Sequence, residues 1–216
     1  MQLSDNAQQL DLFQLFKPSQ VNIKTKFTFV DLFAGIGGFR IPLSELGGVC
    51  LGYSEIDKEA IKTYQINFIT DKNSDELCLG NINNINKLPF DIDIITGGVP
   101  CQPWSIAGKL KGLDDPRGQL WLDVFRVVEL NQPKAFIFEN VKGLIEPRNK
   151  DSLNYIISNL TQSGYVVKYQ VLNSYDFGLP QDRDRIFIVG IRNDLENCWG
   201  FTFPNSLNKQ LKLYNV

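Results

Sequence analysis

Histidine is absent from this 216-residue chain, which contains only four cysteines and one methionine. Without histidine, Ser-His-Asp and Cys-His nucleophiles and all histidine metal ligands are excluded. The cysteines lie far apart and form no C-x-x-C pair, so neither a disulfide framework nor a zinc site is expected; they are Cys50, Cys78, Cys101 and Cys198. The sequence therefore predicts no metal site, and a nucleophilic cysteine would need a base other than histidine.

Long apolar runs and a strong net charge are also missing. No apolar run approaches the roughly 18 residues that span a membrane, and the N-terminus lacks a basic region followed by an apolar one. We therefore expect a soluble, cytoplasmic protein. The 22 basic and 24 acidic residues give a net charge of −2 and a pI near 5.3, unlike a protein that binds nucleic acid through its overall field. Any nucleic-acid site must be local or shared with a partner.

Short β-rich runs alternate with helical stretches from Phe27 onward. Strands are predicted over Phe27–Phe33, Val49–Ser54, Ile92–Thr96, Ala135–Phe138, Val166–Leu172 and Ile186–Ile191. Helices are predicted over Gly38–Leu46, Asp57–Phe68, Gln119–Leu130 and Asp151–Ser163. This alternation is typical of an α/β protein with a largely parallel sheet covered on both faces. The last two strands lack a clear helix between them, so we expect them to form an antiparallel appendage.

One domain accounts for most of the chain. With 43% hydrophobic residues the chain can bury one sizeable core. Residues 1–25 are polar with one apolar cluster, which predicts a short amphipathic helix or a loose tail, and we assign no function to them. Residues 26–195 form the predicted domain, and residues 196–216 a C-terminal extension.

The most informative segment is Gly-Val-Pro-Cys-Gln-Pro-Trp-Ser at residues 98–105. Prolines restrict the backbone on both sides of Cys101, and the segment follows a predicted strand, where open α/β sheets bind their ligands. A lone cysteine is usually a buried core residue. A turn is seldom buried, however, because its backbone polar groups would lack partners. Cys101 is therefore the leading candidate nucleophile.

A glycine-rich turn follows the first predicted strand, with the sequence Asp-Leu-Phe-Ala-Gly-Ile-Gly-Gly-Phe-Arg at residues 31–40. Its N–H groups can approach a nucleotide-type ligand closely, although the turn alone is equally compatible with a structural role. Glu55 lies about 20 residues further on, where a carboxylate can accept hydrogen bonds from a ribose diol. Asp57 is also explained as the N-cap of the next helix. Together these features predict a nucleotide-type cofactor.

These segments resemble the motifs of the cytosine-C5 DNA methyltransferases, which use S-adenosylmethionine. The motifs, in family order, are a cofactor motif at 31–38, a nucleophile motif at 98–105, a further element at 115–120, an acid motif at 139–141 (Glu-Asn-Val) and a cytosine-clamping motif at 181–185 (Gln-Asp-Arg-Asp-Arg). The resemblance covers roughly residues 27 to 194. It implies a Rossmann-like class I S-adenosylmethionine-dependent methyltransferase fold, double-stranded DNA as substrate and a restriction–modification role.

The resemblance assigns catalytic roles to Cys101, Glu139, Arg183 and Arg185. Addition of a thiolate to C6 of cytosine makes C5 nucleophilic enough to attack the methyl group of the cofactor. Negative charge then develops on N3 and O2, where Glu139 as an acid and Arg185 as a cation would lower the barrier. Glu139 follows an apolar strand, where desolvation favours its protonated form. Arg183 and Arg185 are two apart and share one strand face, although alternation with aspartates usually indicates a solvated charge cluster.

The resemblance also implies binding residues. Cofactor contacts are expected from Asp31, Phe33, Ala34, Gly35, Gly37, Gly38, Glu55, Ile56, Asn81, Ile82, Pro100 and Leu120. Substrate contacts are expected from Gln102, Ser105, Asn140, Val141 and Gln181. Residues 105–118 resemble a loop that closes on a flipped base, and an ordinary surface loop is the alternative.

The chain departs from the family in two respects. Asn81 stands where the family usually has aspartate, although its side-chain oxygen can still accept a hydrogen bond. The target-recognition region and the last two family motifs, expected after Asp194, are absent, and residues 196–216 are too short to replace them. We favour one subunit of a split methyltransferase, whose partner polypeptide carries those parts. A truncated product and a cofactor-binding protein without catalysis remain open.

Two other functions are compatible with parts of the motif pattern. A branch of the family methylates tRNA, and the shared motifs do not distinguish DNA from RNA. A nicotinamide-dependent dehydrogenase would explain the glycine turn and Glu55, but it leaves residues 100–103 and 181–185 unexplained.

Overall fold

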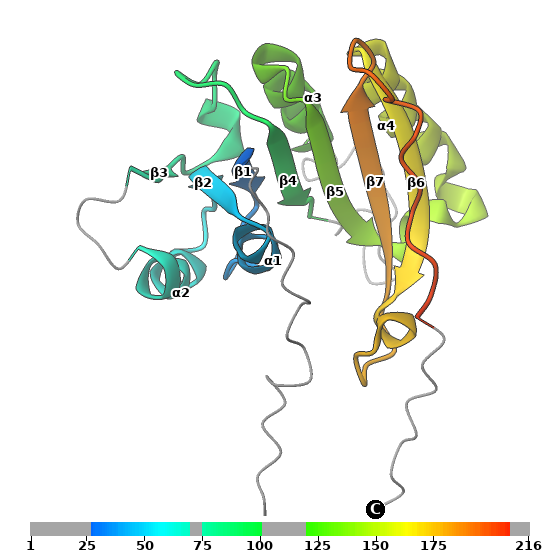
Figure 1. Ribbon diagram of the computed structural model, residues 1–216, viewed down its shortest axis with the longest axis horizontal. Helices are drawn as coiled ribbons and strands as arrows, with labels where there is room; N and C mark the ends of the chain where they lie inside the picture. Colours follow the sequence, from blue (N-terminus) through cyan, green and yellow to red (C-terminus); the bar gives the residue numbers. More distant parts are fainter. Residues whose placement is uncertain (1–26, 70–74, 101–119, 208–216) are drawn as a thin grey trace, which may run out of the picture.

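The computed structural model of the chain describes residues 27–69, 75–100 and 120–207. Within them, seven strands form one sheet with helices on both faces (Figure 1). The strands are β1 (Phe27–Leu32), β2 (Gly48–Ser54), β3 (Leu77–Cys78), β4 (Ile94–Gly98), β5 (Ala135–Val141), β6 (Tyr165–Asn173) and β7 (Asp184–Arg192). The helices are α1 (Arg40–Glu45), α2 (Lys58–Phe68), α3 (Leu120–Asn131) and α4 (Lys150–Gln162). Short 3₁₀ helices are η2 (Ile82–Asn84), η5 (Lys142–Ile145), η6 (Pro147–Asn149) and η7 (Ser174–Phe177).

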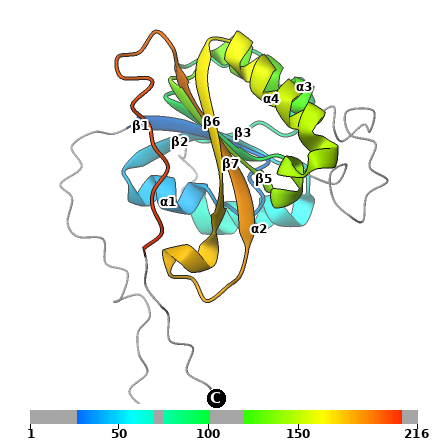
Figure 2. The same cartoon turned by 90° about the vertical axis from the view of Figure 1, so that its right-hand side faces the viewer.

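The strand order is β3-β2-β1-β4-β5-β7-β6. The pairs β1–β2, β1–β4, β2–β3 and β4–β5 are parallel, whereas β7 is antiparallel to both β5 and β6. The predicted Rossmann-like class I methyltransferase fold, with a mostly parallel sheet and an antiparallel C-terminal pair, is thus confirmed. The pair is not an appendage as expected, because β7 inserts between β5 and β6 and continues the main sheet (Figure 2).

The two faces of the sheet are packed unequally. α3 and α4 cover one face and form the main core with β1, β4, β5 and β7. α1 and α2 cover the other face over β1, β2 and the start of β4. Burial alternates along β5, where Phe136 and Phe138 enter the main core while Glu139 points to the opposite face. That alternation leaves Glu139 free for a site on the less covered face.

The segment after β7 returns along β6. Lys168 donates hydrogen bonds to the carbonyl oxygens of Trp199 (2.9 Å) and Phe201 (2.6 Å), and the Leu207 N–H donates to Asp176 O (2.9 Å). Part of the predicted C-terminal extension is therefore packed against the domain, and it brings residues 201–207 close to η7.

The predicted elements occur with small shifts at their ends. α2 begins as expected, because Asp57 caps it by accepting a hydrogen bond from the Ala60 N–H at 2.8 Å. α1 begins at Arg40 rather than Gly38, since the preceding turn has positive φ at Gly37 (98°), which a helix does not allow. β3 was not predicted, because it has only two residues and both are exposed. No helix in the described residues is long and apolar enough to cross a membrane.

Candidate active site

A pocket of about 290 Å³ opens where β1, β2 and β4 end. Its lining consists of Phe33, Ser54, Glu55, Ile56, Asn81, Ile82, Asn83, Gly98, Pro100 and Leu120. Seven of these were predicted to contact a cofactor: Phe33, Glu55, Ile56, Asn81, Ile82, Pro100 and Leu120. They come from five separate places in the sequence, and the parallel sheet brings them to one edge. We call this the cofactor pocket.

The glycine-rich turn depends on unusual backbone conformations. φ is positive at Phe33 (54°), Gly35 (54°) and Gly37 (98°). A Cβ added at Gly37 would lie 2.3 Å from Cε2 of Phe68, the last residue of α2. Ala34 is buried, and its N–H donates to Ser54 O at 2.9 Å, which joins the turn to the end of β2. Glycine is therefore required at position 37 both for its φ and for space.

Glu55 is held by the backbone of the turn and of its own strand end. One carboxylate oxygen accepts a hydrogen bond from the Gly35 N–H (2.8 Å), and the other accepts from the Ile56 (2.7 Å) and Asp57 (2.9 Å) N–H groups. A carboxylate offers about four acceptor positions, so these three bonds leave about one for a ligand hydroxyl. The sequence predicted two bonds to a ribose diol but gave no sign of this backbone network.

Asn81 also has a local partner. Its side-chain oxygen accepts from the Asn83 N–H at 3.0 Å and caps η2. Gly80, with φ of 64°, precedes it, and Gly80 O accepts a hydrogen bond from the Ser54 hydroxyl at 2.7 Å. The amide oxygen of Asn81 keeps a second lone pair for a donor in the pocket. The position is thus structurally suited to the predicted contact.

Asp31 lies beneath the turn and is not part of the pocket lining. It is 1% exposed, and one carboxyl oxygen accepts from the Thr96 hydroxyl at 3.0 Å, while the other has no partner among the described residues. Burial raises the pKa of Asp31 to about 7, and the nearby carboxylates of Glu76 and Glu55 add to that effect. The Thr96 hydrogen bond and the charge of Arg40 act in the opposite direction.

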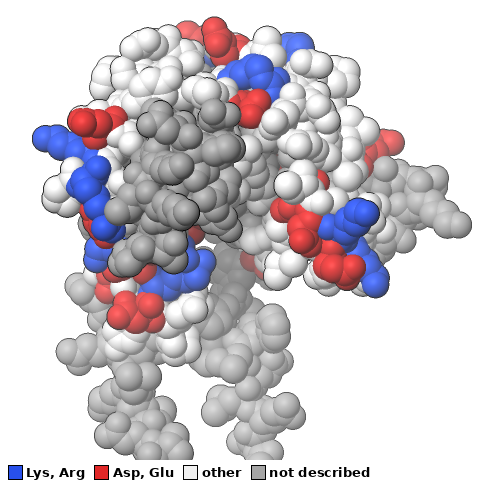
Figure 3. All heavy atoms as spheres, turned by 180° about the vertical axis from the view of Figure 1, so that it is seen from behind, with Lys and Arg blue, Asp and Glu red and all other residues white. Residues whose placement is uncertain are grey.

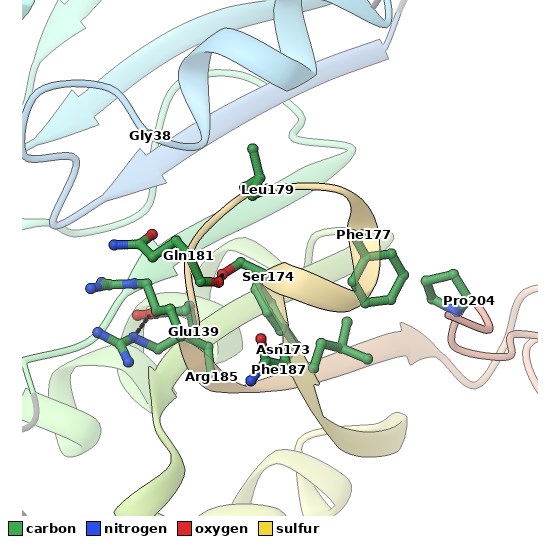
Figure 4. Close-up of a pocket in the computed structure, with 12 residues that line it drawn as sticks. Gly38, Glu139, Asn173, Ser174, Phe177, Leu179, Gln181, Arg185, Phe187 and Pro204 are labelled. Carbon is green, nitrogen blue, oxygen red and sulfur yellow. Dashed lines mark hydrogen bonds and ion pairs between the residues drawn. The ribbon is translucent and has the colours of Figure 1, made fainter. Parts of the chain in front are cut away.

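A second pocket, of about 680 Å³, lies between the ends of β5 and β7 and the β6–β7 connection (Figure 4). It is lined by Gly38, Glu139, Leu172, Asn173, Ser174, Phe177, Leu179, Gln181, Arg183, Arg185, Phe187 and Pro204. The predicted catalytic residues Glu139, Arg183 and Arg185 all reach it, together with the predicted substrate residue Gln181. We call this the base pocket. Gly38, expected at the cofactor, instead lines this pocket.

Glu139 and Arg185 form an ion pair in the base pocket. Arg185 Nε lies 2.6 Å from Glu139 Oε1, and the two side chains are 23% and 24% exposed (Figure 4). The apolar surroundings expected for Glu139 are therefore not found, because antiparallel pairing of β7 with β5 places a guanidinium beside it.

Gly98 connects the two pockets. It lines the cofactor pocket and lies opposite Glu139 in the β4–β5 register. A Cβ added at Gly98 would be 3.6 Å from Glu139 Oε2. The chain that leads to the nucleophile motif therefore passes between the cofactor pocket and the predicted acid. Cys101, Gln102, Ser105 and the predicted loop at 105–118 lie outside the described residues.

Asn140 holds the backbone below both pockets. It is 1% exposed, its amide nitrogen donates to Val99 O at 3.2 Å, and its amide oxygen accepts from the Val141 N–H at 2.8 Å. The side chain thus ties the end of β5 to the turn before Cys101. Asn140 and Val141 line neither pocket in this structure, and their contact with substrate stays a prediction.

The aspartates of the clamping motif are bound to other elements. Asn173 donates to Asp182 Oδ1 (2.6 Å) and Asp184 Oδ1 (2.9 Å), and Lys142 pairs with Asp184 at 2.8 Å. Hydrogen bonds from Lys142 and Asn173 hold the pKa of Asp184 below its usual range. β7 begins at Asp184, so Arg183 precedes the strand, yet both arginines line the pocket. The alternating charges are not simply a self-paired cluster.

Sequence reasoning missed the apolar part of the base pocket. Phe177 and Pro204 lie at the opposite end of the pocket from Glu139 and Arg185 (Figure 4). Phe177 belongs to the β6–β7 connection, which the sequence marked only as a link between strands. No sequence signal placed Pro204 here, because its position depends on how the segment after β7 returns along β6.

The other described side chains add no competing chemistry. None of the three described cysteines lines either of these pockets, and burial raises the pKa of Cys50 to about 12, so its thiol stays protonated. Within the described ranges there is no group of three or more histidine, cysteine, aspartate or glutamate side chains that could hold a metal ion.

Comparison with known proteins agrees with this geometry. Residues 27–215 match the family model of the C-5 cytosine-specific DNA methylases. Type II methyltransferase M.HgiBI of Herpetosiphon aurantiacus is 54% identical over 191 residues, which are 88% of this chain and 43% of that protein. Type II methyltransferase M.HpaII of Haemophilus parainfluenzae is 43% identical over 203 residues, or 91% of this chain and 55% of that protein.

Solved structures that superpose on this chain include a DNA modification methyltransferase and a DNMT2 protein. A putative DNA modification methyltransferase encoded within an E. coli prophage superposes with a TM-score of 0.63 at 26% identity, over 79% of this chain and 49% of that one. Spodoptera frugiperda DNMT2 superposes with a TM-score of 0.58 at 25% identity, over 79% and 51%. The chain spans about half the length of the curated relatives it matches. Since the family model covers most of its residues, the chain belongs to the C-5 cytosine-specific DNA methylase family.

Proposed function

We propose that this chain is the cofactor-binding and catalytic part of an enzyme that transfers a methyl group from S-adenosylmethionine to C5 of a cytosine in double-stranded DNA. The observation that carries the proposal is the arrangement of the two pockets. The cofactor pocket and the base pocket meet at Gly98, which lies opposite Glu139 and three residues before Cys101. A methyl donor in one and a cytosine in the other would lie side by side.

The residues of the cofactor pocket fit a nucleoside. Glu55 has about one acceptor position left for a ribose hydroxyl, and Asn81 has one lone pair left for an amino group. The aromatic ring of Phe33 and the side chains of Ile56, Ile82 and Leu120 supply apolar contacts for an adenine. S-adenosylmethionine, when bound, supplies an electrophilic methyl group.

In the proposed reaction the Cys101 thiolate forms a bond to C6 of cytosine, and an electron pair moves toward N3 and O2. Glu139 delivers a proton to N3, and Arg185 binds O2. C5 then takes the methyl group. S-adenosylhomocysteine is left after the transfer. Loss of the C5 proton to solvent, cleavage of the C6–sulfur bond and return of the N3 proton to Glu139 restore the aromatic ring, the thiolate and the acid. Cytosine must leave the duplex to reach these groups, at a cost of a few kcal/mol.

The ion pair sets a condition for this chemistry. Arg185 Nε is directed at Glu139 Oε1, at 2.6 Å, and not into the space for a base. The proposed reaction therefore requires Arg185 to turn to O2 of the base, which frees Glu139 Oε1 to face N3. Arg183, which lines the same pocket, provides a second positive charge for the base or its phosphate.

We infer that target recognition comes from a second polypeptide. The net charge of −2 provides little general attraction for DNA. On the face in Figure 3, the lysine and arginine side chains of the described residues lie beside aspartates and glutamates and form no continuous basic patch among themselves. A partner that carries the DNA-reading surface would supply what this chain lacks, within a restriction–modification system.

The experiment is a covalent trap. Duplex DNA of mixed sequence that carries 5-fluorocytosine cannot lose fluorine from C5, so the cysteine adduct persists after methyl transfer. With the partner polypeptide present, we expect an adduct that survives denaturation and requires both S-adenosylmethionine and Cys101, with Cys101→Ser as control; the chain alone should form none. An adduct formed by the chain alone would contradict the need for a partner. An adduct formed only with tRNA would reassign the substrate, and an adduct with Cys101→Ser would disprove the mechanism.

A further inference from the structure

A buried ion pair lies beside the cofactor pocket without belonging to it. Arg40 Nη2 is 3.2 Å from Glu76 Oε2, and the two side chains are 16% and 4% exposed. Arg40 begins α1 directly after the glycine-rich turn, whereas Glu76 directly precedes β3. Neither residue lines the cofactor pocket or the base pocket, and the mechanism above uses neither of them.

Aromatic rings enclose the pair. The Arg40 guanidinium lies 5.7 Å from the ring centroid of Phe29 and 5.4 Å from that of Phe68. The second oxygen of Glu76 accepts a hydrogen bond from the buried Tyr64 hydroxyl at 2.6 Å. Arg40 also donates to the Ser44 hydroxyl within α1. The charges are thus fixed from several sides, and both residues also line a third pocket, of about 450 Å³.

The same residues support the glycine-rich turn. A Cβ added at Gly37 would lie 2.3 Å from the Phe68 ring and 3.4 Å from Arg40 Cβ, so the turn rests directly on these two side chains. On the other side of the pair, the chain runs from Glu76 through β3 to Gly80. Gly80 is bound to the end of β2 by the Ser54 hydroxyl at 2.7 Å.

Stability alone does not explain this arrangement. Removing two charges from water costs several kcal/mol for each ion, and well-packed apolar residues are often as stable as a buried ion pair. Arg40 Nε adds to the cost, because it is buried without a hydrogen-bond partner among the described residues. The ion pair does provide a directional link between the start of α1, which follows the glycine-rich turn, and the residue before β3. Arg40 and Glu76 lie 36 residues apart in sequence.

We propose that Arg40 and Glu76 are positioning residues for the cofactor, whose ion pair fixes the glycine-rich turn at residues 33–38 relative to the loop at residues 79–81. This inference rests on the proposed function, since it assumes that both loops hold S-adenosylmethionine. The pair touches no ligand itself. It acts through Phe68 and α1 on one side and through β3 on the other.

The pair also acts on the buried carboxyl under the turn. Asp31 faces Thr96 from β4 and feels the charges of Glu76, Arg40 and Glu55. After burial and the Thr96 hydrogen bond, Glu76 raises and Arg40 lowers the pKa of Asp31. Removing Arg40 should therefore shift the pKa of Asp31 upward, and removing Glu76 should shift it downward. Loss of packing alone would not give two opposite shifts.

The test uses the full chain with Arg40→Met and Glu76→Gln. Calorimetry gives the dissociation constant for S-adenosylmethionine, and carboxyl NMR gives the pKa of Asp31 without ligand. We expect Arg40→Met to weaken cofactor binding about tenfold, which is within the range of coupling energies between contacting residues. The same variant should raise the pKa of Asp31. Glu76→Gln should weaken binding less and lower the Asp31 pKa.

A matched control separates positioning from general stability. Tyr165→Phe removes another buried hydrogen bond, from the Tyr165 hydroxyl to Pro133 O at 2.8 Å, on the opposite face of the sheet. It should lower the urea midpoint without changing cofactor affinity. If both test variants bind cofactor as the unaltered chain does, or the Asp31 pKa moves in the same direction in both, the positioning role is wrong.

Two further outcomes are distinguishable. If the unaltered chain binds no S-adenosylmethionine, the proposed function itself fails, and the positioning role fails with it. If Arg40→Met does not fold, Glu76→Gln decides the question, because glutamine keeps the shape of the side chain and an acceptor for the Tyr64 hydroxyl.

Discussion

The cofactor pocket and the base pocket lie next to each other but are built in different ways. In the cofactor pocket, backbone N–H groups hold Glu55, and the turn is fixed by positive φ angles and by the Phe68 ring. In the base pocket, a partly exposed ion pair between Glu139 and Arg185 sets the arrangement. The first is held by backbone hydrogen bonds before a ligand arrives, whereas the proposed reaction requires the second to exchange partners.

The largest effect is expected from a substitution that alters the base pocket alone. Glu139→Gln removes the predicted acid and should slow adduct formation by about 10²–10⁴-fold, the range for loss of a general acid. The free energy of unfolding should change by less than about 1 kcal/mol, because the pair is about a quarter exposed. Gel assays with 5-fluorocytosine DNA and urea unfolding measure both quantities.

Glu146→Gln is the matched control for that prediction. Glu146 forms an ion pair with Arg148 away from both pockets. Its variant should retain the unaltered rate. An equal loss of rate in both variants would show that the effect is not specific to the base pocket.

The second prediction concerns pH and belongs to the cofactor side. Asp31 has a pKa of about 7 in the folded chain against an ordinary 3.8, so folding favours its protonated form. Its contribution to stability is fully present below pH 3.8 and is lost as pH rises through about 7, on the order of 4 kcal/mol in total. Urea unfolding at pH 5 and pH 8 should show this decline. The variant Asp31→Asn should show a flatter profile, and an unchanged profile would mean that another group titrates.

The third prediction compares two adjacent glycines. Gly37→Ala places a Cβ 2.3 Å from the Phe68 ring at a φ of 98°, and it should lower the free energy of unfolding by about 2–4 kcal/mol. Gly38→Ala meets nothing within 4 Å and has no positive φ. It should be nearly neutral in urea unfolding. Equal effects at both positions would argue against the packing of this turn on Phe68.

The smallest expected effect tests the backbone network. Glu55→Gln leaves one N–H of the turn or strand end opposite an amide NH₂ group, and it should weaken binding of S-adenosylmethionine by about tenfold. Asp57→Asn keeps the α2 cap and serves as the control, with binding expected to stay within about twofold. Calorimetry on both variants would sharpen the contrast with Glu139→Gln, which should leave cofactor binding intact.

The same contrast explains what the sequence could predict. The glycine-rich turn, Glu55 and the Asp57 cap depend on neighbours within a few residues or on one strand–turn–helix unit, so local pattern is sufficient. The alternation of strands and helices likewise predicted the sheet. The resemblance to a family then placed Glu139, Arg183 and Arg185 in one site, and the structure brings these three side chains to one pocket.

What the sequence could not predict depends on long-range pairing. The ion pair of Glu139 with Arg185 exists because β7 lies antiparallel to β5, 46 residues further along the chain. Arg40 and Glu76 meet across the end of α2, and nothing in either segment indicates the other. Burial of Asp31 beneath its own turn was missed for the same reason.

The position of β7 has a consequence for how the protein is made. β7 is the last of the described strands along the chain, yet it lies inside the sheet between β5 and β6. While a ribosome is still producing residues before β7, β6 has no neighbouring strand and Glu139 has no Arg185 beside it. The base pocket therefore forms only after β7 has been made, and a chain released before Arg185 would have the strands of the cofactor pocket without the Glu139–Arg185 ion pair.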